Sequence, residues 1–128
     1  MTNDPFKTFM ADRTTWRGQI NSCVDKGVRE RPPVSGTEYK AFIVHEADEF
    51  GRRRRNALAV SIGHYDADQD KIIVDVIRAD IDIDDWETLS KRYGNVMVCG
   101  AIGDKSDALS HATAGVISML KDKLKVPL

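Results

Sequence analysis

Apolar residues along this chain cluster in four short runs whose composition is typical of β-strands. The runs cover residues 39–44, 57–65, 72–78 and 96–102, and most are rich in β-branched side chains. The first is nearly all apolar, which suits a strand covered on both faces, and the fourth is again nearly all apolar. A short acidic turn at residues 66–70 predicts that the second and third runs form an antiparallel hairpin.

The third run alternates in a way that assigns its side chains to the two faces of a sheet. Strict alternation predicts one face with Ile73, Asp75 and Ile77, and an opposite face with Ile72, Val74 and Val76.

Helical spacing of apolar residues appears in three other segments. Residues 5–27 carry aromatic and aliphatic side chains three and four positions apart, with Asp4 and Pro5 placed to begin a helix. Residues 82–93 follow the third strand, and Gly94 is placed to end this helix. Residues 107–124 form the last amphipathic segment, and Ser106 is placed as its N-cap.

The order of these elements is helix, three strands, helix, strand, helix. A right-handed crossover through the second helix returns the chain to a parallel position. We therefore expect an α/β fold that resembles the first half of the ribonuclease H architecture: a mixed sheet of three antiparallel strands and a fourth parallel strand, with an N-terminal and a C-terminal helix. We expect one domain over residues 1–128, made of an N-terminal helical segment (1–30), a linker (31–37) and an α/β core (38–128).

Composition adds constraints on partners and location. The 128 residues are 41% hydrophobic and 30% charged, which is ordinary for a globular domain, and the net charge is −1. Any binding to nucleic acid must therefore come from a local patch. With no apolar run near the ~20 residues of a membrane span and an acidic N-terminus, we expect a cytoplasmic protein with no membrane partner. Cys23 and Cys99 are expected to be buried free thiols.

Three motifs in residues 20–104 resemble the nuclease domain of phage terminase large subunits. They are the Arg-Glu-Arg-Pro-Pro lead-in before a Tyr-x-Ala-Phe-Ile-Val strand, the Ala-x-Ser-Ile-Gly-His strand end, and the returning Ile-Val-Asp-Val-Ile-Arg strand. The resemblance implies a phage or prophage origin and a ribonuclease H-like fold. It also implies DNA cleavage by two divalent cations, Mg²⁺ or Mn²⁺, that carboxylates hold.

The chain departs from the family at the positions that carry this chemistry. His45 stands where the family has its first catalytic aspartate, and Asn56 stands at a second acidic position, whereas Gly103-Asp104 matches a later Gly-Asp pair. Losing two metal ligands leaves no pair of cations, so we expect a catalytically degenerate protein that binds protein or nucleic acid.

Two alternatives remain open for the function. One is a metal-dependent DNA endonuclease with a rearranged site, whose metal candidates are His45, Glu46, Asp48 and Asp104, with Asp48 and Asp104 as the catalytic candidates. Against it, the acidic segment 46–49 also fits a solvated loop balanced by neighbouring arginines. The other alternative is an unrelated α/β domain that binds a small ligand.

Residues 52–55 form the only dense basic run, namely Arg52, Arg53, Arg54 and Arg55. Four arginines on one loop can neutralise several phosphates, so DNA is a predicted partner at this loop. The competing interpretation is an exposed loop whose arginines pair with Glu46, Asp48 and Glu49. A homodimer through the sheet edge or through the aromatic N-terminal helix is the other predicted partner.

The histidines suggest one further arrangement. His45 and His64 would face each other if the first two strands pair, and Asp75 would then complete a zinc-like set. The spacing matches no zinc pattern, so ordinary buried or edge histidines are favoured.

Overall fold

A computed structural model of the chain describes residues 29–94 and 96–126 and contains one mixed β-sheet. The strands are β1 (Arg29–Glu30), β2 (Tyr39–Ala47), β3 (Arg53–Asp66), β4 (Lys71–Ile81) and β5 (Met97–Ile102). Two α-helices, α3 (Ile83–Arg92) and α4 (Ala108–Leu120), and the 3₁₀-helix η1 (Lys121–Lys123) complete the described part. The predicted helix over residues 5–27 lies outside the described residues.

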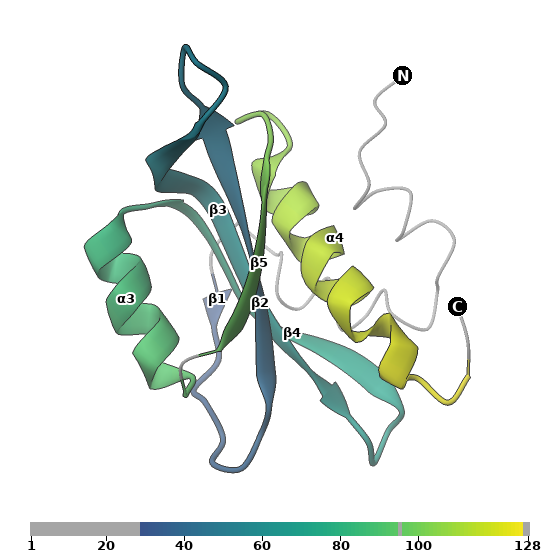
Figure 1. Cartoon of the computed structure of the whole chain (residues 1–128). Coiled ribbons are helices and arrows are strands. Elements are labelled where there is room, and N and C mark those ends of the chain that lie inside the picture. Colours follow the sequence, from purple (N-terminus) through teal and green to yellow (C-terminus); the bar gives the residue numbers. More distant parts are fainter. Residues whose placement is uncertain (1–28, 95, 127–128) are drawn as a thin grey trace.

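The strand order across the sheet is β1-β4-β3-β2-β5 (Figure 1). β2, β3 and β4 are antiparallel neighbours, and β5 lies parallel to β2 at one edge. The prediction of three antiparallel strands followed by a parallel fourth strand is thereby confirmed. The short β1 adds a further antiparallel pairing on the outer edge of β4.

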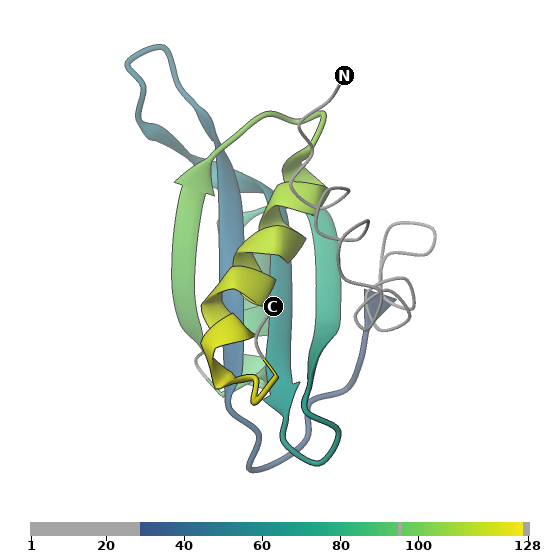
Figure 2. The same cartoon turned by 90° about the vertical axis from the view of Figure 1, so that its right-hand side faces the viewer.

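The two α-helices cover opposite faces of the sheet (Figure 1). On one face, Leu89 of α3 packs in a core cluster with Ile43 and Ile62 of the sheet. On the other face, α4 lies along the strands (Figure 2), and its Val116 packs against Val74. Each face therefore buries one helix against the central strands, which makes a three-layer arrangement.

Close packing of α4 on the sheet depends on two glycines. A Cβ atom added to Gly115 would overlap the ring of Phe42, and one added to Gly63 would lie 2.8 Å from Cγ1 of Val116. These positions therefore set the distance between helix and sheet.

β4 contains a β-bulge that breaks the predicted alternation. Val76 lies opposite Ile62 and Val74 lies opposite Gly63, so Asp75 is the extra residue. As a result Ile77 joins Val74 in the cluster under α4, whereas Val76 joins the cluster under α3. The predicted faces, with Val76 beside Val74 and Ile77 on the other side, are wrong beyond the bulge.

The sequence signals for helix ends agree with the structure for α3 but not for α4. Gly94 follows α3 with φ +80°, at the predicted end of the helix. At the other end, Asp82 caps α3 by accepting a hydrogen bond from the Asp85 N–H at 2.8 Å. In α4 the N-cap residue is Asp107, so the prediction of Ser106 at this position is wrong. Within residues 29–94 and 96–126, no helix combines the length and apolar character needed to cross a bilayer.

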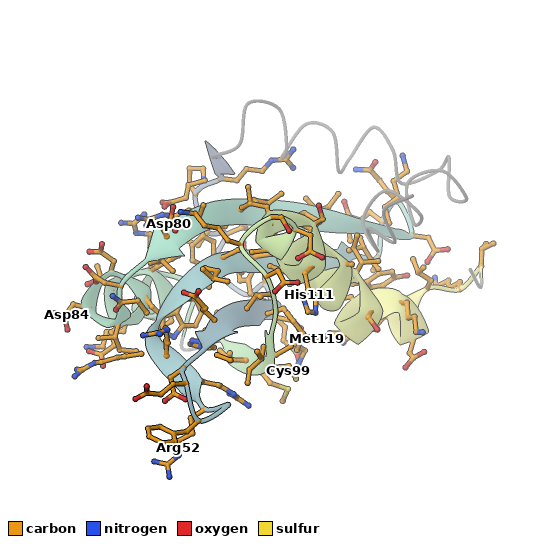
Figure 3. All side chains as sticks on the ribbon, turned by 90° about the horizontal axis from the view of Figure 1, so that it is seen from above. Arg52, Asp80, Asp84, Cys99, His111 and Met119 are labelled. Carbon is orange, nitrogen blue, oxygen red and sulfur yellow. The ribbon has the colours of Figure 1, made fainter. Side chains whose placement is uncertain are left out.

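β5 is much more exposed than its apolar sequence suggests. Met97, Val98 and Ile102 have exposed fractions of 62%, 41% and 44%, because this strand forms the edge of the sheet. Cys99 is also exposed and free (Figure 3), so the prediction that its thiol is buried is wrong. Cys23 lies outside the described residues.

Candidate nucleic-acid interface

A β-hairpin extends beyond the body of the sheet at the end where β2 meets β3 (Figure 1). β3 begins at Arg53, and Ala47 pairs with Arg53, so three of the four arginines lie on a strand rather than on the predicted loop. We call residues 45–56 the arm. Register shifts on both sides of His45 mark its base, where bulges increase the bend and twist of the ribbon.

The turn at the tip of the arm is held by Asp48. Its Oδ1 accepts hydrogen bonds from the N–H groups of Phe50 at 2.9 Å and Arg52 at 2.8 Å. Its own N–H donates to the carbonyl of Arg52 at 2.8 Å. Gly51 adopts φ +77°, a conformation that glycine reaches without steric cost. The tip is therefore an ordered turn that presents Phe50 and Arg52 in a defined geometry.

All four arginines of the arm are exposed to solvent. Among the residues that the structure describes, their one ion pair joins Nε of Arg54 to Oε2 of Glu46 at 3.8 Å, and both side chains are more than half exposed, so it is weak. Within the described part of the chain, Arg53 and Arg55 pair with no carboxylate. The register shift between His45 and Ala47 interrupts the alternation of side chains here, so the two arginines have different surroundings: Arg53 extends toward Gly100 of β5, whereas Arg55 lines a cleft beside Asp80.

The tip combines a cation with an apolar ring. Phe50 is 75% exposed, and the guanidinium carbon of Arg52 lies 5.9 Å from its ring centroid. Arg52 lies at the outer end of the arm (Figure 3). An exposed aromatic beside an arginine is a suitable contact for the sugar and base surfaces of a nucleic acid.

One side of the arm is less suited to phosphate. A cleft of about 440 Å³ at its base is lined by Arg54 and Arg55 and also by Glu46, Asp80 and Asp82. These carboxylates repel phosphate, so we expect a nucleic acid to contact the tip and the outer part of the arm rather than this cleft.

The residues predicted as metal ligands are only partly brought together. Gly103 N–H donates to the carbonyl of His45 at 2.9 Å, which places Asp104 at the same end of the sheet as His45. His45 Nδ1 lies 2.9 Å from the carbonyl oxygen of Arg54, and Asp48 is engaged in the turn. Among residues 29–94 and 96–126, no three His, Cys, Asp or Glu side chains are grouped so as to hold a metal ion.

Asp107 is a residue of this region that sequence reasoning missed as a functional candidate. Its Oδ1 is buried and has no hydrogen-bond partner in the described part of the chain. It precedes α4 and belongs to the turn that follows Asp104, whose carbonyl accepts its N–H at 3.3 Å. The sequence offered a signal only in the crowding of acidic residues between β5 and α4.

The two histidines of the β2–β3 hairpin do not face each other. His45 pairs with Ala57, and His64 pairs with Tyr39 at the other end of the hairpin, so that arrangement is wrong. Instead, His64 Nδ1 lies 2.7 Å from Oδ2 of Asp75, and Asp75 is 4% exposed. The bulge in β4 brings these two residues together, and no periodic pattern in the sequence indicates it.

His64 borders an open cleft of about 480 Å³, together with Thr37, Glu38 and Lys123. The ring of Tyr39 packs edge-on against the His64 ring, with centroids 5.3 Å apart and an interplanar angle of 74°. These contacts hold the imidazole of His64 in place. The role of His64 is therefore to provide a hydrogen-bond partner for the buried Asp75 carboxylate.

Comparison of the chain with protein-family models, with curated protein sequences and with solved structures yields no match.

Proposed function

We propose that this protein binds duplex nucleic acid through the arm, without cutting it. The observation that carries the proposal is the pair of exposed arginines, Arg52 and Arg53, at the outer part of an ordered β-ribbon and without carboxylate partners in the described residues. A two-stranded ribbon fits the ≈ 12 Å width of a DNA major groove, and β-ribbons are established readers of duplex DNA.

The charges of the arm determine how strongly it is expected to bind nucleic acid. The arm carries four arginines against Glu46, Asp48 and Glu49. Arg54 is balanced by Glu46, and the charge of Asp48 is partly satisfied by the N–H groups of the turn. Two or three phosphate contacts remain, which corresponds to a weak, salt-sensitive affinity in the range of roughly 10⁻⁴ to 10⁻⁶ M.

Duplex rather than single-stranded nucleic acid is the favoured ligand. Proteins that bind single strands stack successive bases on several aromatic side chains. The arm has one aromatic residue, Phe50, and it lies at the tip rather than along the ribbon. One exposed ring serves better as a wedge against a groove than as a stacking platform.

We also propose that the protein derives from a ribonuclease H-like nuclease of the terminase type. Two observations support this lineage: the order β4-β3-β2-β5 with β5 parallel to β2, and the three motifs in residues 20–104. His45 and Asn56 in place of acidic residues support a loss of cleavage.

The proposal is tested by fluorescence anisotropy with a labelled DNA duplex across a range of KCl concentrations. The double variant Arg52→Gln/Arg53→Gln is compared with the matched control Lys121→Gln/Lys123→Gln, which removes the same charge from exposed positions of η1. We expect at least a tenfold loss for the arm variant, and a salt slope smaller by about 2 because about 0.9 counterions are released per phosphate. Equal affinities for the two variants would refute binding through the arm.

The alternative of a rearranged endonuclease is favoured by one observation, the buried and unpartnered Oδ1 of Asp107 beside the Asp104 turn. Incubation of supercoiled DNA with Mn²⁺ tests it. Nicking by the wild type that disappears in Asp104→Ala, and equally in Asp48→Ala or Asp107→Ala, would establish cleavage and remove the proposal of a non-cutting protein.

A further inference from the structure

The two edges of the sheet differ in how they are closed. At the β4 edge, β1 pairs with β4, and the Arg31 N–H donates to the Asp75 carbonyl at 2.9 Å. Glu30 of β1 also forms ion pairs with Arg78 at 3.3 Å and Arg92 at 2.6 Å. At the β5 edge, no strand of the described part of the chain pairs with the outer side of β5.

β5 has none of the features that usually protect an open edge. Natural edge strands carry lysines, prolines, bulges or inward charges that prevent pairing with another chain. β5 reads Met-Val-Cys-Gly-Ala-Ile, without a charge or a proline, and pairs with β2 over its whole length without a register shift. Three of its apolar side chains are also exposed, as described above. The strand therefore has the properties of a pairing surface.

We propose that β5 pairs with β5 of a second copy of this chain, antiparallel and about a two-fold axis, so that two sheets become one. A second copy fits better than a foreign peptide. Peptide-binding edges gain specificity from pockets for alternate side chains, whereas Cys99, Gly100 and Ala101 leave the middle of β5 flat. A flat and uncharged strand is complementary to itself, and a two-fold axis uses the open edges of both copies.

The exposed β-branched residues indicate where the axis lies. Paired residues of parallel strands point to the same face, so Gly100 lies on the face of Ile43, which is the α3 face. By alternation Val98 and Ile102 lie on that face too. With Gly100 on the axis, Val98 of each copy lies opposite Ile102 of the other, and both exposed side chains become covered. Cross-strand aliphatic pairs of this kind are stabilising.

Arg53 lies near this axis. A Cβ atom placed on Gly100 would be 3.3 Å from Nη1 of Arg53, so the guanidinium reaches over β2 to the edge strand. In the dimer the two Arg53 side chains approach each other and repel. Dimerisation therefore becomes stronger when salt screens this repulsion, which is opposite to the salt dependence of nucleic-acid binding. Because the two salt dependences have opposite signs, a failure of the proposed dimer can be distinguished from a failure of nucleic-acid binding.

Sedimentation velocity of the full chain under reducing conditions tests the dimer. We expect a concentration-dependent dimer for the wild type, and at least a tenfold weaker one for Val98→Lys, because a lysine on the edge opposes pairing. The matched control is Val126→Lys, a valine that is 72% exposed and lies outside the sheet. A wild type that stays monomeric at about 100 µM, a concentration sufficient for weak interfaces, would overturn the proposal, as would equal dimerisation of the two variants.

Cross-linking locates the interface independently of stability. In a Cys23→Ser background, Cys99 is the only thiol, and in the proposed register the two copies of Cys99 are diagonal neighbours about 7–8 Å apart. A short bismaleimide is expected to give a covalent dimer. Met97→Lys should give less of this product, and it replaces Val98→Lys as the edge variant if circular dichroism shows that Val98→Lys is unfolded. Absence of cross-linking in a Cys23→Ser dimer, or a ladder of higher oligomers, would contradict two-fold pairing through β5.

Discussion

Nδ1 of His64 lies 2.7 Å from Oδ2 of Asp75 and joins β3 to β4 at the point where the β-bulge interrupts their register. The Asp75 side chain is 5% exposed and that of His64 is 19% exposed, so the carboxylate depends on this partner rather than on water. Asp75 also belongs to the segment that β1 covers, through the Arg31 N–H. The pair therefore stabilises the bulge that displaces Val76 and Ile77 to opposite faces.

Removing the histidine from this pair is expected to destabilise the fold. His64→Ala leaves the Asp75 carboxylate buried without its partner, and breaking such pairs typically costs about 3 kcal/mol of unfolding free energy. Urea denaturation of His64→Ala beside the double variant His64→Ala/Asp75→Ala measures the effect. We expect the double variant to recover part of the loss, because no buried charge is left, whereas additive losses would show that the two side chains do not interact.

Replacing Ser61 with alanine is expected to stabilise the protein. Ser61 is 0% exposed, and its Oγ has no hydrogen-bond partner in the described residues. Removing an unsatisfied hydroxyl recovers its desolvation cost, so we expect a gain of about 1 kcal/mol in urea denaturation. The control is Thr113→Val at another fully buried hydroxyl, which donates to the Leu109 carbonyl at 2.9 Å and whose loss should not stabilise. A loss of stability in Ser61→Ala would show that its hydroxyl is satisfied in solution.

Gly115→Ala is expected to be destabilising because it adds a methyl group where α4 touches the sheet. The new Cβ would overlap the Phe42 ring, and overpacking of this kind costs typically about 1–3 kcal/mol. Phe42→Leu in the same chain provides space, so the double variant should be more stable than the sum of the single changes predicts. Thermal unfolding of the four proteins measures this coupling, and strict additivity would contradict the contact.

Asp70 gives the stability a dependence on acidic pH. Its carboxylate accepts hydrogen bonds from the Lys125 N–H at 2.9 Å, the Val126 N–H at 3.2 Å and the Tyr65 hydroxyl at 2.6 Å. The backbone N–H of Lys125, followed by the Tyr65 hydroxyl, lowers the pKa of Asp70 below its ordinary value of 3.8. The hydrogen bond between the Tyr65 hydroxyl and Asp70 also raises the pKa of Tyr65 to about 12.

A carboxyl whose pKa is lower in the folded state stabilises the fold above its ordinary pKa and loses this contribution as pH falls through the folded value. We therefore expect Asp70→Asn to reduce stability at neutral pH and to flatten its decline below about pH 4. Asparagine also tolerates the φ of +52° at this position, so the backbone remains unstrained. Urea midpoints across the acid range measure the effect, and parallel pH profiles for the two proteins would exclude Asp70 as their source.

Arg53→Gln is expected to change the two proposed interactions in opposite directions. It removes one phosphate contact, which weakens duplex binding several-fold, and it removes the repulsion at the two-fold axis, which strengthens the dimer. Arg52→Gln should weaken duplex binding to a similar extent and leave dimerisation unchanged, since Arg52 lies at the tip of the arm and the guanidinium beside Gly100 is that of Arg53. Anisotropy and sedimentation velocity on the same preparations measure both effects. A weaker dimer in Arg53→Gln would contradict the position of the axis.

Much of the sheet and of α3 could be predicted from the sequence because local signals agreed with the tertiary structure. The acidic turn after Tyr65 indicated the β3–β4 hairpin, and Gly94 indicated the end of α3. The candidate interface was harder to predict. Residues 53–55 were expected in a loop because charged side chains are rare in covered strands, yet in the arm backbone pairing alone makes a strand that water surrounds.

Two other predictions were wrong for a related reason: a run of apolar residues does not indicate which strands or helices will lie beside it in the fold. β5 has the composition of a covered strand but lies at the edge, and Cys99 is exposed for that reason. The bulge at Asp75 depends on how β3 and β4 align, so the alternation of β4 alone could not reveal the His64–Asp75 pair.

The parallel pairing of β2 with β5 also has a consequence for the order of folding. Lys40 and its partner Met97 are 57 residues apart, whereas β2, β3 and β4 are joined by short turns. Closing so long a loop costs more entropy than forming a meander, so we expect the meander to form first and β5 to dock late. Changes in β5 should therefore accelerate unfolding and leave the rate of folding nearly constant. If β5 docks last, the edge of β2 that it covers is open to pairing with another chain until then.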